Sequence, residues 1–190
     1  MASILNVDQI NNAAGTSAVT IDPSTGKPSF PNGAVLPAGS VVQVQSSSKL
    51  STQTGVGSIA VSASSTYIST DNEVSITPKF ANSKIIVQVH GGSFFAATPD
   101  TRGYVTIFRF VSGQANVDLA NGAGFGLTNH YNDSANHMSP TMCGAVDSSL
   151  VDTVTPHIYK LYMARNGPSG TIYFGYDPSN VYMTAMEIAQ

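Results

Sequence analysis

Apolar and polar residues alternate with a period of two along most of the chain, which is the pattern of β-strands. The clearest examples are residues 41–45, 84–90, 104–111 and 181–188, which are separated by turn-forming clusters of Gly, Pro, Asn, Asp and Ser. No long segment shows the 3.6-residue apolar period of an amphipathic helix. Short strands at intervals of about 8–12 residues predict an all-β fold, an antiparallel, jelly-roll-like β-sandwich spanning residues 41–190.

One pair of strands is predicted to form a local hairpin. Residues 67–70 and 73–77 alternate in polarity, and Asp71-Asn72 between them is a good two-residue connection. Pro78 ends the second strand because proline cannot donate a backbone hydrogen bond.

The first 40 residues form a separate region with almost no charge. A strand is predicted at 18–22, a turn at 23–26 and a returning strand at 27–30. A segment this short cannot bury a core alone, so residues 1–40 are predicted to be an extended segment that pairs with identical chains or with a larger particle. The apolar residues predicted to make this attachment are Leu5, Val7, Ile10, Val19 and Ile21.

Three of the predicted strands are apolar on both faces, at residues 104–111, 157–164 and 181–188. A sheet with one solvated face should instead alternate apolar with polar residues. We therefore expect one face to pack in the core and the other on a second subunit, although a sheet enclosed within one chain gives the same pattern. The residues predicted to form the subunit interface are Val105, Ile107, Val181, Met183 and Ala185.

Composition excludes several classes of function. Of the 190 residues, 42% are hydrophobic and only 10% are charged, against about 25% charged in typical proteins. The formal net charge is −3 and no basic cluster is present, which excludes phosphate-driven nucleic-acid binding. No apolar run approaches the ~20 residues of a membrane span, and no secretory signal opens the chain, so assembly in a cytoplasm is expected. The single cysteine excludes an intrachain disulfide, so robustness is expected to come from oligomerisation.

The sequence shows no convincing catalytic or metal motif. The four histidines form no closely spaced pair, and Cys143 has no evident catalytic partner. The glycines at 122–126 lack the strand, helix and acid of a dinucleotide fingerprint. We therefore predict no enzyme activity, no cofactor and no metal ion.

Carboxylates in predicted loops keep two alternatives open. Two of them could form a glycosidase acid–base pair, and several could hold calcium. These residues are Asp118, Asp133, Asp147, Asp152 and Asp177.

Aromatic and amide side chains cluster in several predicted loops near residues 129–138 and 173–177. Aromatic faces beside hydrogen-bonding groups complement the apolar faces and hydroxyls of sugars, although core or subunit packing would use the same residues. The residues predicted to contact a receptor are His130, Tyr131, Asn132, His137, Tyr176 and Asp177.

Three stretches resemble tail-fibre or virion appendage proteins of tailed bacteriophages, particularly marine phages. They are residues 4–10 (ILNVDQI) with 14–16 (AGT), 74–79 (VSITPK) with 83–85 (SKI), and 184–188 (TAMEI). The resemblance implies a homotrimer, an N-terminal part that binds other virion proteins, and a C-terminal β-sandwich head that faces the host.

Together, these observations predict a non-enzymatic virion protein, a tail-fibre or spike component that attaches to a host-surface glycan or protein. We expect it to be assembled in the host cytoplasm, without binding nucleic acid or inserting into a membrane. The first alternative is a capsid decoration or knob protein that binds no receptor. The second is a spike that degrades glycans.

Overall fold

The structure is a computed structural model. The residues it describes are 8–11, 14–15, 17–29, 36–50, 59–61, 66–96, 98–121, 126–133, 137–150, 152–166, 170–175 and 180–190. The chain divides into two compact units, Met1–Pro37 and Ala38–Gln190, which we call the N-terminal unit and the head. Gly39 and Ser40 belong to the head because they exchange backbone hydrogen bonds with Ala189, at 2.8 and 2.9 Å. Within the described residues, no helix has the length and apolar character needed to cross a membrane.

The N-terminal unit contains a small antiparallel sheet. Its strands, in the order β1-β2-β3, are β1 (Gln9–Asn11), β2 (Ser17–Ile21) and β3 (Pro28–Ser29). Between β2 and β3, the Asp22 carboxylate accepts the backbone N–H groups of Ser24 and Thr25, each at 2.8 Å. The turn and the returning strand are confirmed, and the returning strand β3 pairs with β2.

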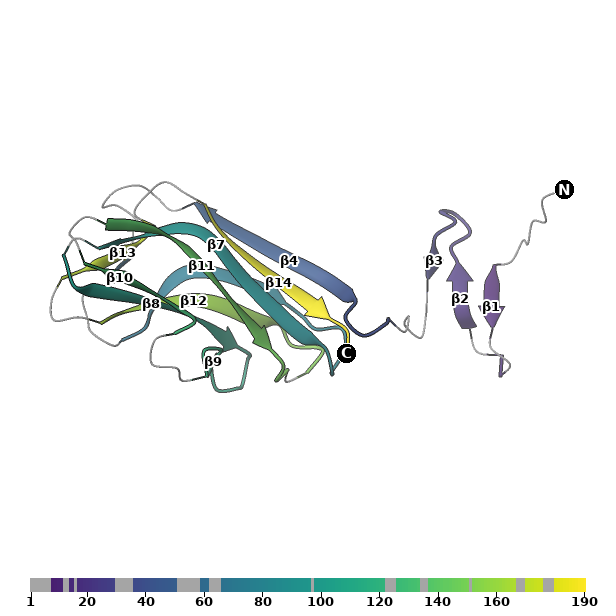
Figure 1. Cartoon of the computed structure of the whole chain (residues 1–190). Helices are drawn as coiled ribbons and strands as arrows, with labels where there is room; N and C mark the ends of the chain where they lie inside the picture. Colours follow the sequence, from purple (N-terminus) through teal and green to yellow (C-terminus); the bar gives the residue numbers. More distant parts are fainter. Residues whose placement is uncertain are drawn as a thin grey trace. The chain divides into compact units, whose positions relative to one another are not determined.

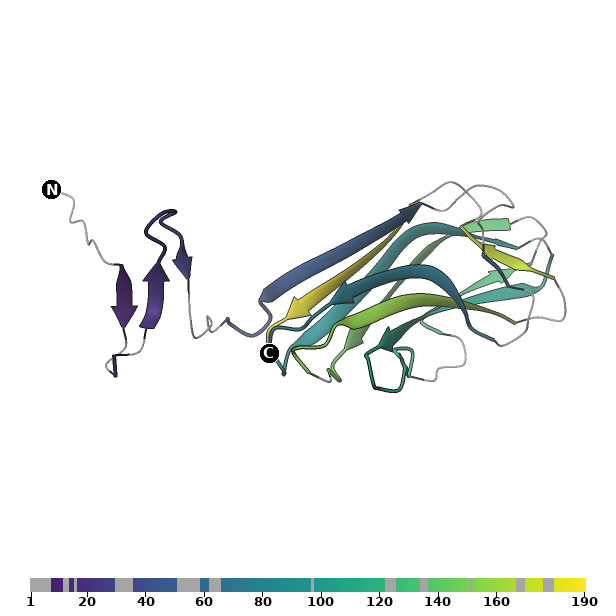
Figure 2. The ribbon, with the colours of Figure 1, turned by 180° about the vertical axis from the view of Figure 1, so that it is seen from behind.

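The head consists of two antiparallel sheets packed face to face, as Figures 1 and 2 show from opposite sides. The five-stranded sheet has the order β10-β8-β12-β6, with β9 also paired to β8. Its strands are β6 (Ile68–Ile76), β8 (Thr101–Phe110), β9 (Val117–Asp118), β10 (Thr128–Asn132) and β12 (His157–Asn166). The predicted all-β antiparallel sandwich is confirmed.

The six-stranded sheet has the order β4-β14-β7-β13-β5, and β11 pairs with β7. Its strands are β4 (Val41–Leu50), β5 (Ile59–Val61), β7 (Lys84–Ala96), β11 (His137–Asp147), β13 (Ile172–Phe174) and β14 (Asn180–Ile188). The long strand β7 pairs first with β14 and then with β13.

The core lies between the sheets and is built from alternate residues of each strand. Tyr159, Leu161 and Met163 of β12 face Val87 of β7 and Ala185 of β14 within one cluster. Full burial of one such large side chain stabilises the fold by roughly 1.5–3 kcal/mol. The period of two that predicted the strands therefore also builds the core.

The predicted subunit-interface residues lie inside the protomer, so that prediction is wrong for these side chains. All five have an exposed fraction of 2% or less because the opposite sheet of the same chain covers them. They are Val105, Ile107, Val181, Met183 and Ala185. A surface between copies would have to use the other face of these sheets.

Part of that other face is covered by the chain itself. On β8, Tyr104 and Thr106 point away from the core, yet their exposed fractions are 3% and 0%. The Thr106 hydroxyl donates to the Asp118 carboxylate, and the N–H groups of Leu119 and Leu127 bond to carbonyls of β8. The alternative of a sheet enclosed by its own chain thus holds for this part of the five-stranded sheet.

The predicted hairpin at residues 67–77 is wrong. Strand β6 runs through Asp71 without reversing, and the β12 register shifts there, with Lys160 opposite Glu73 and Tyr162 opposite Ser69. Asp71 has a φ of 58°, and the chain forms a bulge in β6 at this residue instead of a turn.

Candidate functional site

The sheet of the N-terminal unit carries one apolar face. Ile10 lies opposite Val19, and Ile21 shares their face because it is two residues along β2. Ile10 is 49% exposed, and no described residue of this unit is buried. The structure therefore brings together three of the predicted attachment residues, whereas Leu5 and Val7 lie outside the described residues.

Strand β10 carries three of the predicted receptor-contact residues, His130, Tyr131 and Asn132. His130 and Tyr131 are neighbours on this strand, so their side chains point to opposite faces. The His130 ring stacks on Phe94, with ring centroids 4.6 Å apart. Tyr131 is 53% exposed and lies opposite Arg102 of β8. His130 therefore serves packing within the head, and Tyr131 is the residue that offers a ring to solvent.

The Tyr131 ring is held in place by two charged neighbours. Its hydroxyl donates to the Asp100 carboxylate at 2.8 Å, and this hydrogen bond raises the pKa of the phenol. The Arg102 guanidinium lies 5.1 Å from the ring centroid, within the range of a cation–π contact. These contacts fix the orientation of an exposed aromatic ring, with a carboxylate and a guanidinium group beside it.

The other predicted receptor residues are not all described. Asn132 ends β10 and His137 begins β11, so the two backbones flank residues 133–136. Tyr176 and Asp177 lie outside the described residues. The described side chains of this set are therefore those of His130 and Tyr131.

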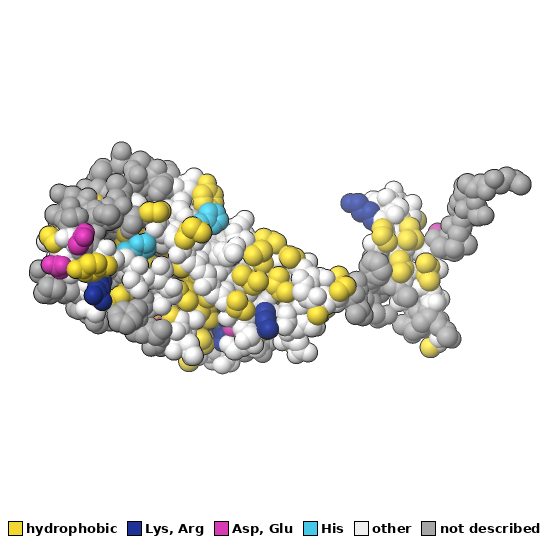
Figure 3. Space-filling model, viewed as in Figure 1, with side chains coloured by type: hydrophobic (Ala, Val, Ile, Leu, Met, Phe, Trp, Pro, Cys, Tyr) yellow, Lys and Arg dark blue, Asp and Glu magenta, His cyan; other side chains and the backbone are white. Residues whose placement is uncertain are grey.

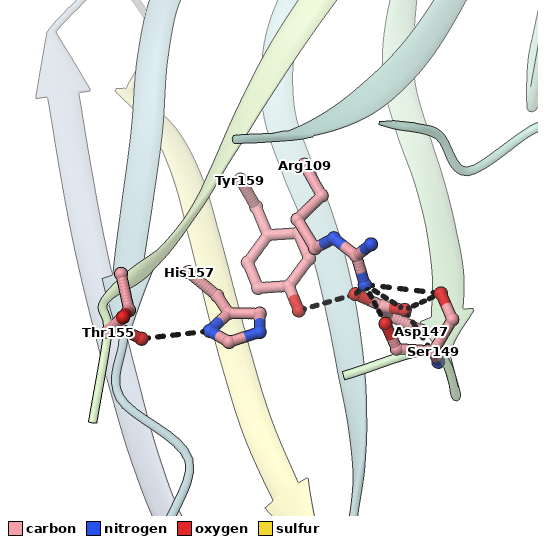
Figure 4. Close-up of polar contacts among 6 residues, drawn as sticks. All are labelled: Arg109, Asp147, Ser149, Thr155, His157 and Tyr159. Atoms are coloured by element: carbon pink, nitrogen blue, oxygen red, sulfur yellow. Dashed lines mark hydrogen bonds and ion pairs between the residues drawn. The ribbon is translucent and has the colours of Figure 1, made fainter. Parts of the chain in front are cut away.

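A buried polar cluster joins the two sheets, as Figure 4 shows. Arg109 of β8 donates through Nη1 to both carboxylate oxygens of Asp147, at 3.0 and 2.9 Å. The Tyr159 hydroxyl donates to the same carboxylate at 2.9 Å, and the Ser149 N–H does so at 3.0 Å. The Ser149 carbonyl oxygen also accepts from Arg109. Because Asp147 ends β11, the cluster ties this strand to the opposite sheet.

The cluster keeps its charges in the folded state. Burial disfavours a charged Asp147, but the Ser149 N–H, the Tyr159 hydroxyl and the Arg109 charge outweigh it, so the pKa of Asp147 is lowered. Burial and the neighbouring Asp147 raise the pKa of Tyr159, which remains a donor. His157, also in Figure 4, donates from Nδ1 to the Thr155 carbonyl at 3.0 Å. Each of these polar side chains forms a hydrogen bond or ion pair within the protein, so we assign the cluster a structural role.

A second buried acid anchors the loop between β6 and β7. Glu187 of β14 is fully buried and accepts the backbone N–H groups of Lys79 and Phe80, the shortest at 2.8 Å. Gln43 also donates to Glu187, at 2.7 Å, and so does the hydroxyl of Ser83. Burial opposes ionisation, but these donors lower the pKa of Glu187. This acid is therefore also structural.

The remaining candidates for chemistry have local explanations. Burial raises the pKa of the Cys143 thiol to about 12, which keeps it protonated and unreactive at neutral pH. Asp152 accepts the N–H groups of Val154 and Thr155 within its own turn. Among the described residues, no three His, Cys, Asp or Glu side chains come together as metal ligands.

No family model matches the sequence, and no curated protein matches it. Two solved structures of infectious bursal disease virus are similar to this chain. A chain of the T13 viral particle is 12% identical with a TM-score of 0.41, over 91% of this chain and 40% of that one. A chain of the Gx strain is 12% identical with a TM-score of 0.39, over 91% of this chain and 41% of that one. The chain thus spans about two fifths of the length of these viral chains.

Proposed function

We propose that the chain is a non-enzymatic structural protein of a virion, a tail-fibre or spike component. Its N-terminal unit binds other virion proteins, its head faces the host surface, and three copies form the appendage. The observation that carries this proposal is the exposed apolar face of the N-terminal sheet, formed by Ile10, Val19 and Ile21.

The N-terminal sheet has no buried residue among those described, so it lacks a core of its own and needs a surface against which to pack its apolar face. Burial of this face on a neighbouring protein would stabilise the sheet by roughly 1.5–3 kcal/mol for each fully buried Val or Ile. The sequence resemblance of residues 4–10 and 14–16 to appendage proteins supports the same partner, a virion protein. In the head, Asp147, Asp152 and Glu187 serve structural contacts, which favours a scaffold over an enzyme.

Replacement of both Ile10 and Val19 by aspartate in the full chain should reduce the incorporation of the protein into virions. Charges in place of Ile10 and Val19 would have to be buried on the partner, so we expect incorporation to fall at least about tenfold, the equivalent of 1.4 kcal/mol. Incorporation is measured by quantitative mass spectrometry of purified particles. The control Lys27→Asp, in the exposed turn, should be incorporated normally.

Normal incorporation of the double variant, with an unchanged melting temperature of the head, would contradict the proposed attachment. Gold labelling of the wild-type protein on particles then locates it. Label at a tail fibre or spike supports the proposed function, whereas label over the capsid surface favours a decoration protein.

Binding to host cells should depend on Tyr131. We expect Tyr131→Ala to weaken binding of the labelled full chain at least about fivefold, since the exposed ring and its two charged neighbours are the most suitable described contact for a glycan. The matched control is Phe80→Ala, which removes another partly exposed ring, 40% exposed, from the loop between β6 and β7. Equal binding by both variants and the wild type would exclude Tyr131 from the receptor site.

A further inference from the structure

The outer face of the six-stranded sheet carries a continuous apolar row. Val44 on β4 lies opposite Met186 on β14, and Met186 lies opposite Ile86 on β7. Ile86 in turn lies opposite Val146 on β11. Val44 is 52% exposed and Val146 is 58% exposed, so the two ends of the row are open to solvent. Figure 3 shows hydrophobic side chains gathered over these strands, with few charged groups among them.

Further apolar side chains flank this row on both sides. Towards the end of β14, Ile188 lies opposite Val41, which is 54% exposed. Towards its start, Tyr182 is 40% exposed and stacks on His90, with ring centroids 5.3 Å apart. Met142 lies opposite His90 and is 74% exposed, the highest value for an apolar residue of this face. The apolar surface therefore extends well beyond a single row.

The middle of the face is neutral and hollowed. Thr184 lies opposite Gln88, which lies opposite Gly144, and a hollow of about 390 Å³ opens where Gly144 has no side chain. Among the described outward residues of these four strands, the only Asp, Glu, Lys or Arg is Lys84, at the very start of β7. Hydroxyl and amide groups can pair with their own kind, as apolar groups can.

This charge pattern suits contact with identical copies. Rotational symmetry brings residues near the axis against the same residues of other copies, where like charges would repel. A face that is apolar with a neutral polar centre avoids that repulsion. The outer face of the five-stranded sheet is less suitable, because residues of its own chain cover Thr106 there.

We propose that the outer face of the six-stranded sheet is the surface through which copies of this chain bind one another. The inference rests on the self-assembly in the proposed function and identifies its contact surface. Four strands about 4.8 Å apart and seven residues of about 3.3 Å give a flat footprint of about 400 Å² per copy. That is within the ~300–600 Å² of the largest apolar patch on a typical monomer, which is often functional, and below the ~800 Å² per partner of standard interfaces. We therefore expect weak association, in which the fraction of associated copies rises with protein concentration.

Val146→Glu tests the surface in the full-length protein. We expect sedimentation equilibrium to show that the wild type associates and that the variant has a dissociation constant at least about 100-fold higher, because glutamate would meet the same face of another copy. The matched control Val154→Glu introduces the same charge at a loop residue that is 81% exposed, and it should associate like the wild type. Val44→Glu, at the other end of the row, should reproduce the effect of Val146→Glu.

A photo-crosslinking residue at position 146 locates the contact independently of its strength. Adducts on outward residues of β4, β14, β7 or β11 of another copy support the proposal. A monomeric wild type, an unchanged mass for both glutamate variants, or adducts confined to the N-terminal unit would overturn it. A dimer that Val146→Glu separates would keep this surface while contradicting the threefold assembly of the proposed function. If the variant with Ile10→Asp and Val19→Asp is lost from virions but still self-associates like the wild type, attachment to the virion and self-association use different surfaces.

Discussion

Replacement of Asp147 by alanine should destabilise the head by about 3–5 kcal/mol, the cost of leaving a buried charge without its partner. Arg109 and Asp147 are only 5% and 1% exposed, so water cannot readily replace the lost carboxylate. The Tyr159 hydroxyl would lose its acceptor as well. For a unit of this size, the melting temperature should fall by roughly 10 °C. Urea unfolding followed by circular dichroism measures the change in free energy.

Two further variants separate the charge effect from other causes. Asp133→Ala removes an exposed carboxylate and should change the free energy of unfolding by less than about 0.5 kcal/mol. The double replacement Arg109→Met with Asp147→Leu removes both charges and should recover most of the loss, because well-packed apolar pairs replace buried ion pairs at little cost. A loss below about 1 kcal/mol for Asp147→Ala alone would mean that Arg109 reaches solvent in the variant.

The two buried acids show what the sequence does and does not reveal about this fold. Arg109 occurs in an apolar strand at the same parity as Val105 and Ile107, and Glu187 at the same parity as Met183 and Ala185. Charged residues at core positions indicate buried polar contacts, so this signal was available. Their partners were not predictable, because Asp147 and the backbone of Lys79 are far away in the sequence and meet these residues only in the folded sandwich.

Strand periodicity predicted the layers of the head but not which side of each strand faces inwards. A period of two divides the residues of a strand into two sets, and in β8 and β14 both sets are apolar. The packing of the two sheets on each other decides which set faces inwards, and it places Ile107 and Met183 in the core. The interface residues were predicted incorrectly because the inward set was assigned to the outer face. The outer face of β14 is nevertheless apolar at Met186, which lies opposite Val44.

The failed hairpin has a different cause. Asp71-Asn72 favours a left-handed backbone, and Asp71 adopts one, but a single residue with positive φ produces a bulge where two would reverse the chain. Thr70 then bonds through its hydroxyl to the Leu161 carbonyl at 2.9 Å, which keeps the strand attached to β12. Only the presence of a long partner strand distinguishes these two outcomes, and that information lies about 90 residues away along the chain.

Gly91→Ala should be among the most damaging single-methyl changes in the head. Strand β7 leaves β14 after Gly91, which lies opposite Val181, and pairs with β13 from Phe94 onwards. Gly91 has a φ of 86°, and a Cβ there would collide with the backbone carbonyl oxygen of Asn180. Left-handed backbone costs a side-chain-bearing residue about 1–2 kcal/mol, and overpacking adds about 1–3 kcal/mol. We therefore expect a loss of about 2–5 kcal/mol in the free energy of unfolding, measured with urea.

Gly113→Ala isolates the conformational part of this cost. Gly113 has a φ of 77°, close to that of Gly91, but a Cβ there would meet no atom within 4 Å. This variant should therefore lose only the 1–2 kcal/mol of the left-handed backbone. The difference between the two variants measures how closely β7 and the start of β14 approach at the point where β7 changes partners. Equal losses would show that the Asn180 carbonyl moves aside at little cost, and that the crossing of β7 between its two neighbours does not depend on a residue without a side chain.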